Sequence, residues 1–106
     1  MEKIVFNKRV IDYLNEIVLI LHQENYFSYI ENAIDYKDFI LNQITVSNLK
    51  QCKASKAKQK QFGSNYISIK SNNRTSWYVF FDKLDNTYYI EYITNNHTPD
   101  AQFFVD

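Results

Sequence analysis

The sequence contains few of the residues that bend, break or cross-link a chain. Its 106 residues include one glycine, one proline and one cysteine. Flexible linkers need Gly and rigid linkers need Pro, so we expect a single domain, residues 1–106, with one core. Tight turns must be built on Asn, Asp and Ser instead. The lone cysteine, Cys52, cannot form an internal disulfide, which favours a reducing, cytoplasmic location.

Long apolar runs and clusters of metal-ligating residues are also missing. The longest apolar run, Ile17 to Leu21, is far too short to span a bilayer, and the first residues contain no apolar signal-peptide core. We therefore expect no membrane association and no export. Cys52, His22 and His97 have no metal-ligand spacing, so we expect no metal and no cofactor. We interpret His22 as a helix-end residue and Cys52 as a surface thiol without a function.

Apolar and aromatic residues are, by contrast, abundant. Hydrophobic residues make up 45% of the chain and aromatic residues 17%, including nine Tyr and eight Phe. Disordered chains are poor in such residues, so this composition predicts a folded protein.

Helical periodicity is visible in the first half of the chain. From Lys8 to about Gln23, apolar residues recur at i, i+3 or i+4, and i+7, the spacing that lines one face of a helix. Ser28 and Glu31 have the S-x-x-E spacing of a capping box, and the helical period continues from there to roughly Val46. Because the connection between the two helices is short, we expect an antiparallel helical hairpin.

Strand patterns begin and end the chain. Residues 2–6 predict a short first strand, and the β-prone phrases NYISIK, TSWYVFF and TYYIEYIT predict three more after Gly63. Short turns at residues 71–74 and 85–86 join these three strands into hairpins. The predicted order is β-α-α-β-β-β, an α+β fold in which the helical hairpin packs on a small, mainly antiparallel sheet.

The net charge is zero, but the charges are segregated along the chain. Residues 1–38 carry four Lys/Arg and seven Asp/Glu. Residues 39–81 carry seven Lys/Arg and no Asp/Glu, and residues 82–106 carry one Lys and five Asp/Glu. The acid-free middle includes a lysine-rich stretch with Lys50, Lys53, Lys56, Lys58 and Lys60. This segregation predicts a positive patch that binds a phosphate backbone or the acidic segment of a partner protein. A solvated connector is the alternative interpretation.

This order of elements resembles the RelE/ParE superfamily, the toxins of bacterial type II toxin–antitoxin modules. The resemblance covers nearly the whole chain, and its most family-like phrases are FGSNYISIKSNNRTSWYVFF and YYIEYITNNHTPDAQFF. It implies a small cytoplasmic toxin held inactive by a cognate antitoxin. Members similar to RelE cleave messenger RNA on the ribosome, whereas members similar to ParE inhibit DNA gyrase without a nuclease site. The shared scaffold does not choose between these activities.

Three residues are candidates for the ribonuclease site that the likeness to RelE implies. RNA cleavage needs positive charge on the phosphate and groups that move protons to and from the reacting oxygens. Lys70 and Arg74 flank the turn between the first two meander strands, so both could hold a phosphate, although a solvated hairpin tip is the alternative. His97 follows the last strand and could shuttle a proton, and the alternative is a turn residue that binds the backbone.

Two features depart from the nuclease pattern. Thr98 follows His97 where an aromatic residue is common in nuclease members. Trp77 or Tyr78 stands about where those members carry an arginine. The leading interpretation is ribosome-dependent mRNA cleavage, and the alternatives are a non-catalytic gyrase inhibitor and an inactive family member that only binds its antitoxin. For the aromatic residues around Trp77 we expect one set in the core, with a base-stacking platform as the alternative.

Overall fold

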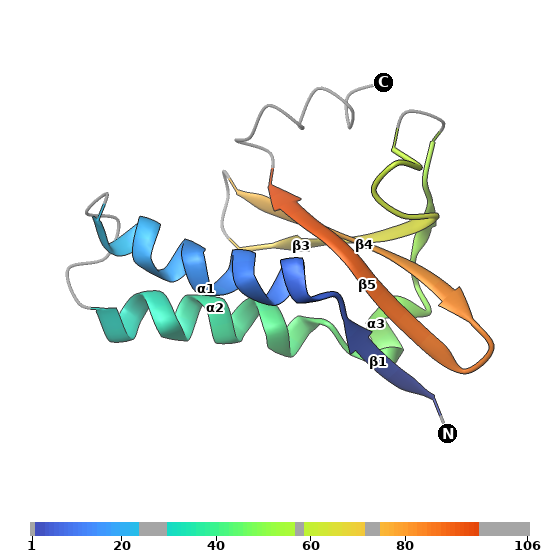
Figure 1. The fold of residues 1–106 in the computed structure, drawn as a ribbon, viewed down its shortest axis with the longest axis horizontal. Helices are drawn as coiled ribbons and strands as arrows, with labels where there is room; N and C mark the ends of the chain where they lie inside the picture. The colour runs from blue at the N-terminus through green and yellow to red at the C-terminus, as the bar shows by residue number, and fades with distance from the viewer. Residues whose placement is uncertain (1, 24–29, 57–58, 72–74, 96–106) are drawn as a thin grey trace.

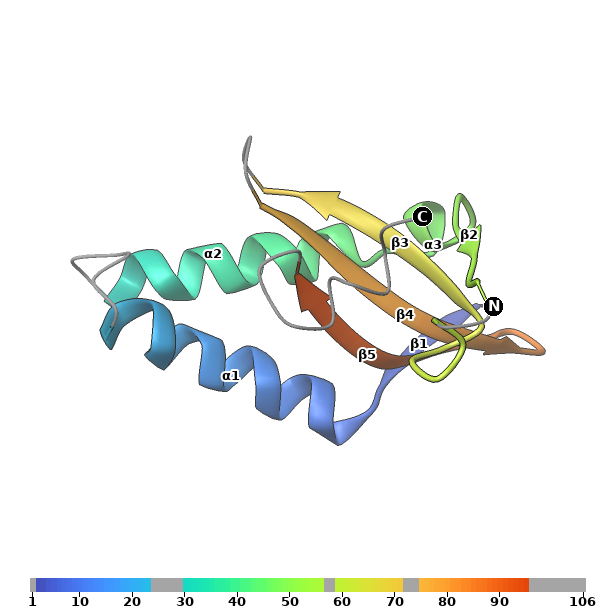
Figure 2. The same cartoon turned by 90° about the horizontal axis from the view of Figure 1, so that it is seen from above.

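A five-stranded sheet with two helices packed against one of its faces makes up the fold (Figure 1). The computed structural model describes residues 2–23, 30–56, 59–71 and 75–95. The elements in chain order are β1 (Lys3–Phe6), α1 (Lys8–Gln23), α2 (Ile30–Gln43), α3 (Val46–Leu49), β2 (Lys53–Ala54), β3 (Asn65–Lys70), β4 (Ser76–Leu84) and β5 (Thr87–Asn95). Figures 1 and 2 show α1 and α2 side by side and antiparallel, with their far ends projecting beyond the sheet.

The strand order in the sheet is β1-β5-β4-β3-β2. The strands β3, β4 and β5 form an antiparallel meander, and β1 lies beside β5 in parallel. The turn between β4 and β5 falls at Asp85 and Asn86, where Asp85 has a φ of 55°, a left-handed conformation that Asp tolerates. The predicted α+β architecture, a helical hairpin on a mainly antiparallel sheet, is confirmed.

The sequence pattern does not reveal the short elements α3 and β2, and it places the end of the second helix too late. This helix ends at Gln43 rather than near Val46. Thr45 has an extended backbone (φ −119°, ψ 158°), and its hydroxyl accepts a hydrogen bond from the Asn48 N–H at 3.1 Å, so it caps a new helix. Ile44 stays buried next to this break, and the apolar period therefore continues across it. The predicted capping box at residues 28–31 lies partly outside the described residues.

The core lies between the helices and the sheet. Val10, Leu14 and Ile17 of α1 are at most 5% exposed, and they form the predicted apolar face of this helix. Ala33 and Ile40 of α2 are fully buried beside them. The sheet contributes Ile67, Ile69, Trp77, Val79, Phe81, Tyr88, Ile90 and Ile93. Alternate residues of β4 thus enter the core, which agrees with the expected alternation of its aromatic residues.

The loop between β2 and β3 folds back over the other face of the sheet. Its ends meet through a hydrogen bond from the Ser55 N–H to the Ser64 carbonyl at 2.9 Å. Inside the loop, the ring of Phe62 stacks on Tyr92 with centroids 4.7 Å apart and lies 5.3 Å from the ring of Phe80. Phe80 is therefore fully buried although it faces away from the helices, and it offers no exposed platform for base stacking.

Gly63, the only glycine of the chain, lies where this loop passes over β4. A Cβ at this position would lie 2.9 Å from the backbone nitrogen of Phe81 and 3.1 Å from the Cβ of Phe80. Backbone atoms cannot move aside as a flexible side chain can, so only glycine fits this close approach.

We predict that Gly63→Ala lowers the free energy of unfolding by about 1–3 kcal/mol, the usual cost of overpacking a close contact. Urea denaturation measures this change. Ser64→Ala is the matched control, because Ser64 is exposed and keeps its backbone N–H, and it should change stability by less than about 0.5 kcal/mol. Equal stabilities of the Gly63 variant and the unmodified protein would contradict the close packing of the loop on β4.

Glu2, just before β1, is held by three groups from distant parts of the chain. One carboxylate oxygen lies 2.8 Å from the Lys50 Nζ; the other lies 3.3 Å from the Lys83 Nζ and accepts a hydrogen bond from the Tyr88 hydroxyl at 2.8 Å. The hydrogen bonds from Lys50 and Tyr88 lower the pKa of Glu2 from 4.5 to about 2. The same contact with Glu2 raises the pKa of Lys50. Glu2 therefore ties the start of β1 to the end of α3 and to the β4–β5 hairpin.

Glu2→Gln should lower the melting temperature at pH 7, because the neutral amide loses both charge-assisted contacts. The pKa of Glu2 is lower in the folded protein, so the carboxylate stabilises the fold above pH 4.5 and loses this effect as the pH falls through about 2. The difference in melting temperature between variant and unmodified protein should thus shrink below pH 4.5. Glu16→Gln, at an exposed position of α1, is the control. A difference that stays constant from pH 7 to pH 2 would refute this role of Glu2.

Candidate binding groove at the sheet edge

The outer edge of β3 is only partly covered by β2. This short strand pairs with Asn65 and Tyr66 alone. Within the described part of the chain, residues 67–70 therefore have β4 on one side and no strand on the other. An uncovered strand edge exposes backbone N–H and C=O groups that can pair with another chain.

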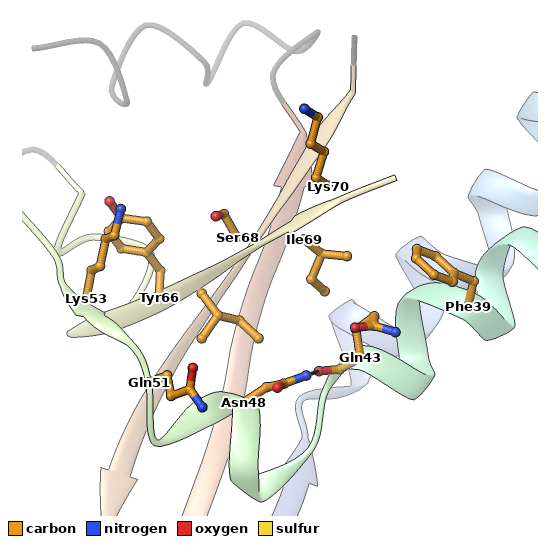
Figure 3. Close-up of a pocket in the computed structure, with 10 residues that line it drawn as sticks. Phe39, Gln43, Asn48, Gln51, Lys53, Tyr66, Ser68, Ile69 and Lys70 are labelled. Carbon is orange, nitrogen blue, oxygen red and sulfur yellow. Dashed lines mark hydrogen bonds between the residues drawn. The ribbon is translucent and has the colours of Figure 1, made fainter. Parts of the chain in front are cut away.

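A groove of about 290 Å³ runs along this open edge, between β3 and the segment from α2 to β2. Its lining residues are Phe39, Gln43, Asn48, Gln51, Lys53, Tyr66, Ile67, Ser68, Ile69 and Lys70. Figure 3 shows Tyr66, Ser68 and Lys70 on one side of β3 and Gln43 and Asn48 on the other. The groove therefore has two chemically different sides with the strand edge between them.

The side away from the helices carries positive charge. Lys53 pairs with Tyr66 across the β2–β3 ladder, and Lys70 lies four residues further along β3, about 13 Å away at the rise of a strand. Both lysines and Ser68, between them on this face, are exposed. The ten lining residues include no Asp or Glu, so neither lysine has a counter-charge within the groove.

The side toward the helices is built from amides and apolar groups. The Asn48 Nδ2 donates a hydrogen bond to the Gln43 carbonyl at 2.7 Å, which fixes the Asn48 side chain across the break between α2 and α3. Phe39 is 41% exposed at the end of the groove, and Ile67 and Ile69 form its buried floor. This side can accept apolar or small polar groups but provides no charge.

Among the three predicted ribonuclease residues, the structure describes one. Lys70 ends β3 with an exposed side chain on the groove. Arg74 and His97 lie outside the described residues, so their predicted approach to Lys70 stays a prediction. On β4, Trp77 is 1% exposed and belongs to the core, and the phosphate-binding charge expected at this position in a nuclease is missing.

The five lysines of the basic stretch do not share one environment. Lys50 is bound to Glu2 and its charge is already balanced, so it does not belong to an acid-free patch. Lys53 lines the groove, and Lys56 and Lys60 lie exposed in the loop between β2 and β3. Lys58 lies outside the described residues. Lys53 and Lys70, which the sequence analysis assigned to different sites, both line this groove.

A chain of hydroxyl groups fixes the end of the β3–β4 hairpin to α2. The buried Trp77 Nε1 donates to the Tyr36 hydroxyl at 2.8 Å, and this hydroxyl lies 2.8 Å from the Ser71 Oγ. The Ser71 Oγ in turn donates to the Thr75 carbonyl at 3.3 Å. Because the Ser71 hydroxyl proton goes to the Thr75 carbonyl, the Tyr36 hydroxyl donates to the Ser71 Oγ, and all three protons have acceptors. The network positions the strand end that carries Lys70.

Tyr36→Phe should leave the buried indole N–H of Trp77 without an acceptor and cost about 1–3 kcal/mol of stability. Trp77 is the only tryptophan, so its emission reports this site directly, and loss of the hydrogen bond should shift the emission to shorter wavelength. Tyr89→Phe, at an exposed tyrosine of β5, is the control and should change neither quantity. Unchanged Trp77 emission in the Tyr36 variant would contradict the network.

Three further features, the environment of Cys52, possible metal ligands and membrane-spanning helices, are described for the part of the chain that the structure covers. Cys52 is half-buried and packs against the core, so it is not the surface thiol that the sequence suggested. The described residues contain no group of three or more His, Cys, Asp or Glu side chains that could hold a metal ion. In the same part of the chain, no helix combines the length and apolar character needed to cross a membrane.

Comparisons with protein-family models, with curated proteins and with solved structures find no match to this chain. The likeness to the RelE/ParE superfamily therefore rests on the order of elements and the residue pattern, and the groove must be interpreted from its own chemistry.

Sequence reasoning missed the groove because it missed the elements that shape it. The alternation of Tyr66, Ser68 and Lys70 with Ile67 and Ile69 does indicate a strand with one polar face. Whether such a strand lies at an edge depends on what pairs beside it, and a two-residue strand such as β2 is too short to leave a periodic signal.

Proposed function

We propose that this chain is the toxin of a type II toxin–antitoxin pair and that it acts on translation by binding RNA of the ribosome. The observation that carries the proposal is the groove, where Lys53 and Lys70 lie on one face of an open sheet edge without any acid among the lining residues. Cations beside an aromatic ring, here Tyr66, suit a nucleic-acid strand that offers phosphates and bases.

The fold supports the proposal at a coarser level. The order of elements and the helical hairpin on a mainly antiparallel sheet are those expected from the likeness to RelE/ParE toxins. A fold hosts many functions, so this agreement is an analogy and the charged groove supplies the specific argument. The partners in this proposal are the ribosome with its mRNA and a cognate antitoxin.

One observation favours the non-catalytic alternative, a ParE-like inhibitor of DNA gyrase or an inactive member of the family. Within the described part of β4 the only cation is Lys83, and its amine is bound to Glu2 at the far end of the strand. The beginning of β4 carries Trp77 and Tyr78 instead. Cleavage by this chain would therefore depend on Arg74 and His97.

Induction of the protein in bacterial cells tests the target. We expect incorporation of labelled amino acids to stop before RNA synthesis slows or plasmid supercoiling changes. Lys53→Glu combined with Lys70→Glu should restore growth, because it reverses both charges of the groove. Lys8→Glu, at an exposed lysine where α1 begins, is the matched control and should stay toxic.

Other outcomes of the same induction decide against parts of the proposal. Loss of supercoiling before loss of translation would identify gyrase as the target. Full toxicity of both Arg74→Ala and His97→Ala, with translation still arrested, would exclude cleavage and leave ribosome binding. Normal growth on induction would reject a toxin.

A further inference from the structure

The direction of the backbone groups along β3 shows what its open edge offers. The Ser64 carbonyl bonds to Ser55 on the β2 side, and the Ser71 N–H bonds to Thr75 on the β4 side. These directions alternate from residue to residue in an antiparallel strand, so even-numbered residues of β3 point toward the β2 side. Beyond the end of β2, the N–H and C=O groups of Ser68 and Lys70 therefore point toward the open side of β3, where the groove lies.

We propose that this groove binds an extended segment of a partner protein, which adds to the sheet as a strand and alternates acidic with apolar residues. The two exposed residues of β3 offer two N–H donors and two C=O acceptors, enough to pair a short strand in line with β2. The inference rests on the open edge and not on the toxin proposal.

The two sides of the groove specify the alternation. A residue that pairs with Ser68 or Lys70 places its side chain on the face of the two lysines, where a carboxylate meets Lys70 directly and Lys53 at the end of β2. Residues between these project to the other side, toward Phe39 and the amides of Gln43 and Asn48. Acidic residues thus recur at every second position and apolar residues fill the gaps.

The charges and the backbone groups of the open edge distinguish this peptide from other occupants. A second copy pairing antiparallel at the same edge would bring Lys53 and Lys70 of both copies together, and like charges across a strand pair are unfavourable. An RNA strand would satisfy the lysines and could stack bases on the aromatic rings, but it has no N–H and C=O groups with the spacing of a β-strand to pair with Ser68 and Lys70.

A synthetic, N-terminally acetylated peptide of alternating glutamate and valine tests the proposal with the purified protein. In the proposed register the glutamate N–H groups face β3 and the valine N–H groups face away. Methylation of two glutamate nitrogens should weaken binding by about tenfold or more, whereas methylation of two valine nitrogens is the matched control and should have little effect. Calorimetry gives the dissociation constants, and NMR should show the largest shifts at the Ser68 and Lys70 amides.

Variants of the protein test the same contacts from the other side. Lys70→Glu should weaken binding about fivefold to tenfold, and Lys8→Glu should leave it unchanged. Ser68→Pro removes an outward N–H without removing a bond to β4, and it should abolish binding. If this variant does not fold, the binding of the methylated peptides to the unmodified protein is sufficient to test the proposal.

Three results would overturn the proposal. Equal binding of both methylated peptides would mean that charge alone attracts the peptide. No binding of the unmethylated peptide at low salt, or a dimer in sedimentation that dissociates in the Ser68 variant, would exclude the acidic strand as occupant. If an RNA oligonucleotide competes with the peptide, the RNA binds the same lysines, and the strand proposal stands. The peptide-binding measurements do not depend on growth arrest in cells. The strand-binding proposal and the toxin proposal can therefore fail independently.

Discussion

The break between α2 and α3 determines how much of the sheet edge stays open. Thr45 ends the helical backbone and caps α3, which turns the chain toward β1, where Lys50 meets Glu2. The chain then returns to the sheet at Lys53, opposite Tyr66, and no described strand covers the rest of this edge of β3. Had α2 continued through Val46, as its apolar period suggested, the following residues would approach the sheet from another position. Residues on both sides of this break, Gln43, Asn48 and Gln51, therefore line the groove.

The sequence predicts those parts of the fold that have a periodic residue pattern or a local turn preference. The apolar face of α1, the three-strand meander and the turn at Asp85 come from periodicity and local turn preference, and these agree with the structure. The parallel neighbour of β1, the strand β2 and the Glu2 cluster are contacts between distant residues, and no local pattern encodes them. The same limit applies to the site, because Lys70 is identifiable as a strand-end cation, but its place on the same groove as Lys53 depends on the register of β2.

The charges that are segregated along the sequence are redistributed in the folded structure. The structure removes Lys50 from the basic stretch by pairing it with an acid of the N-terminal segment, and it separates Lys53 from the lysines of the following loop. A chain with no net charge can thus present a groove whose described lining residues include two lysines and no acid. Net charge describes solubility and long-range steering, whereas recognition depends on which cations remain unbalanced at one place.

The parallel pairing of β1 with β5 constrains how the protein is made. Lys3 pairs with Thr87 and Phe6 with Ile90, so among the described strands β1 pairs with one that is synthesised long after it. During synthesis β1 cannot pair with β5 until the helical hairpin and most of the meander have been made. Strand pairs between such distant residues form late and slowly. Until then the apolar residues of β1 stay available to other unfinished chains. Slow translation or crowded expression should therefore favour misassembly at this strand more than at the locally built meander.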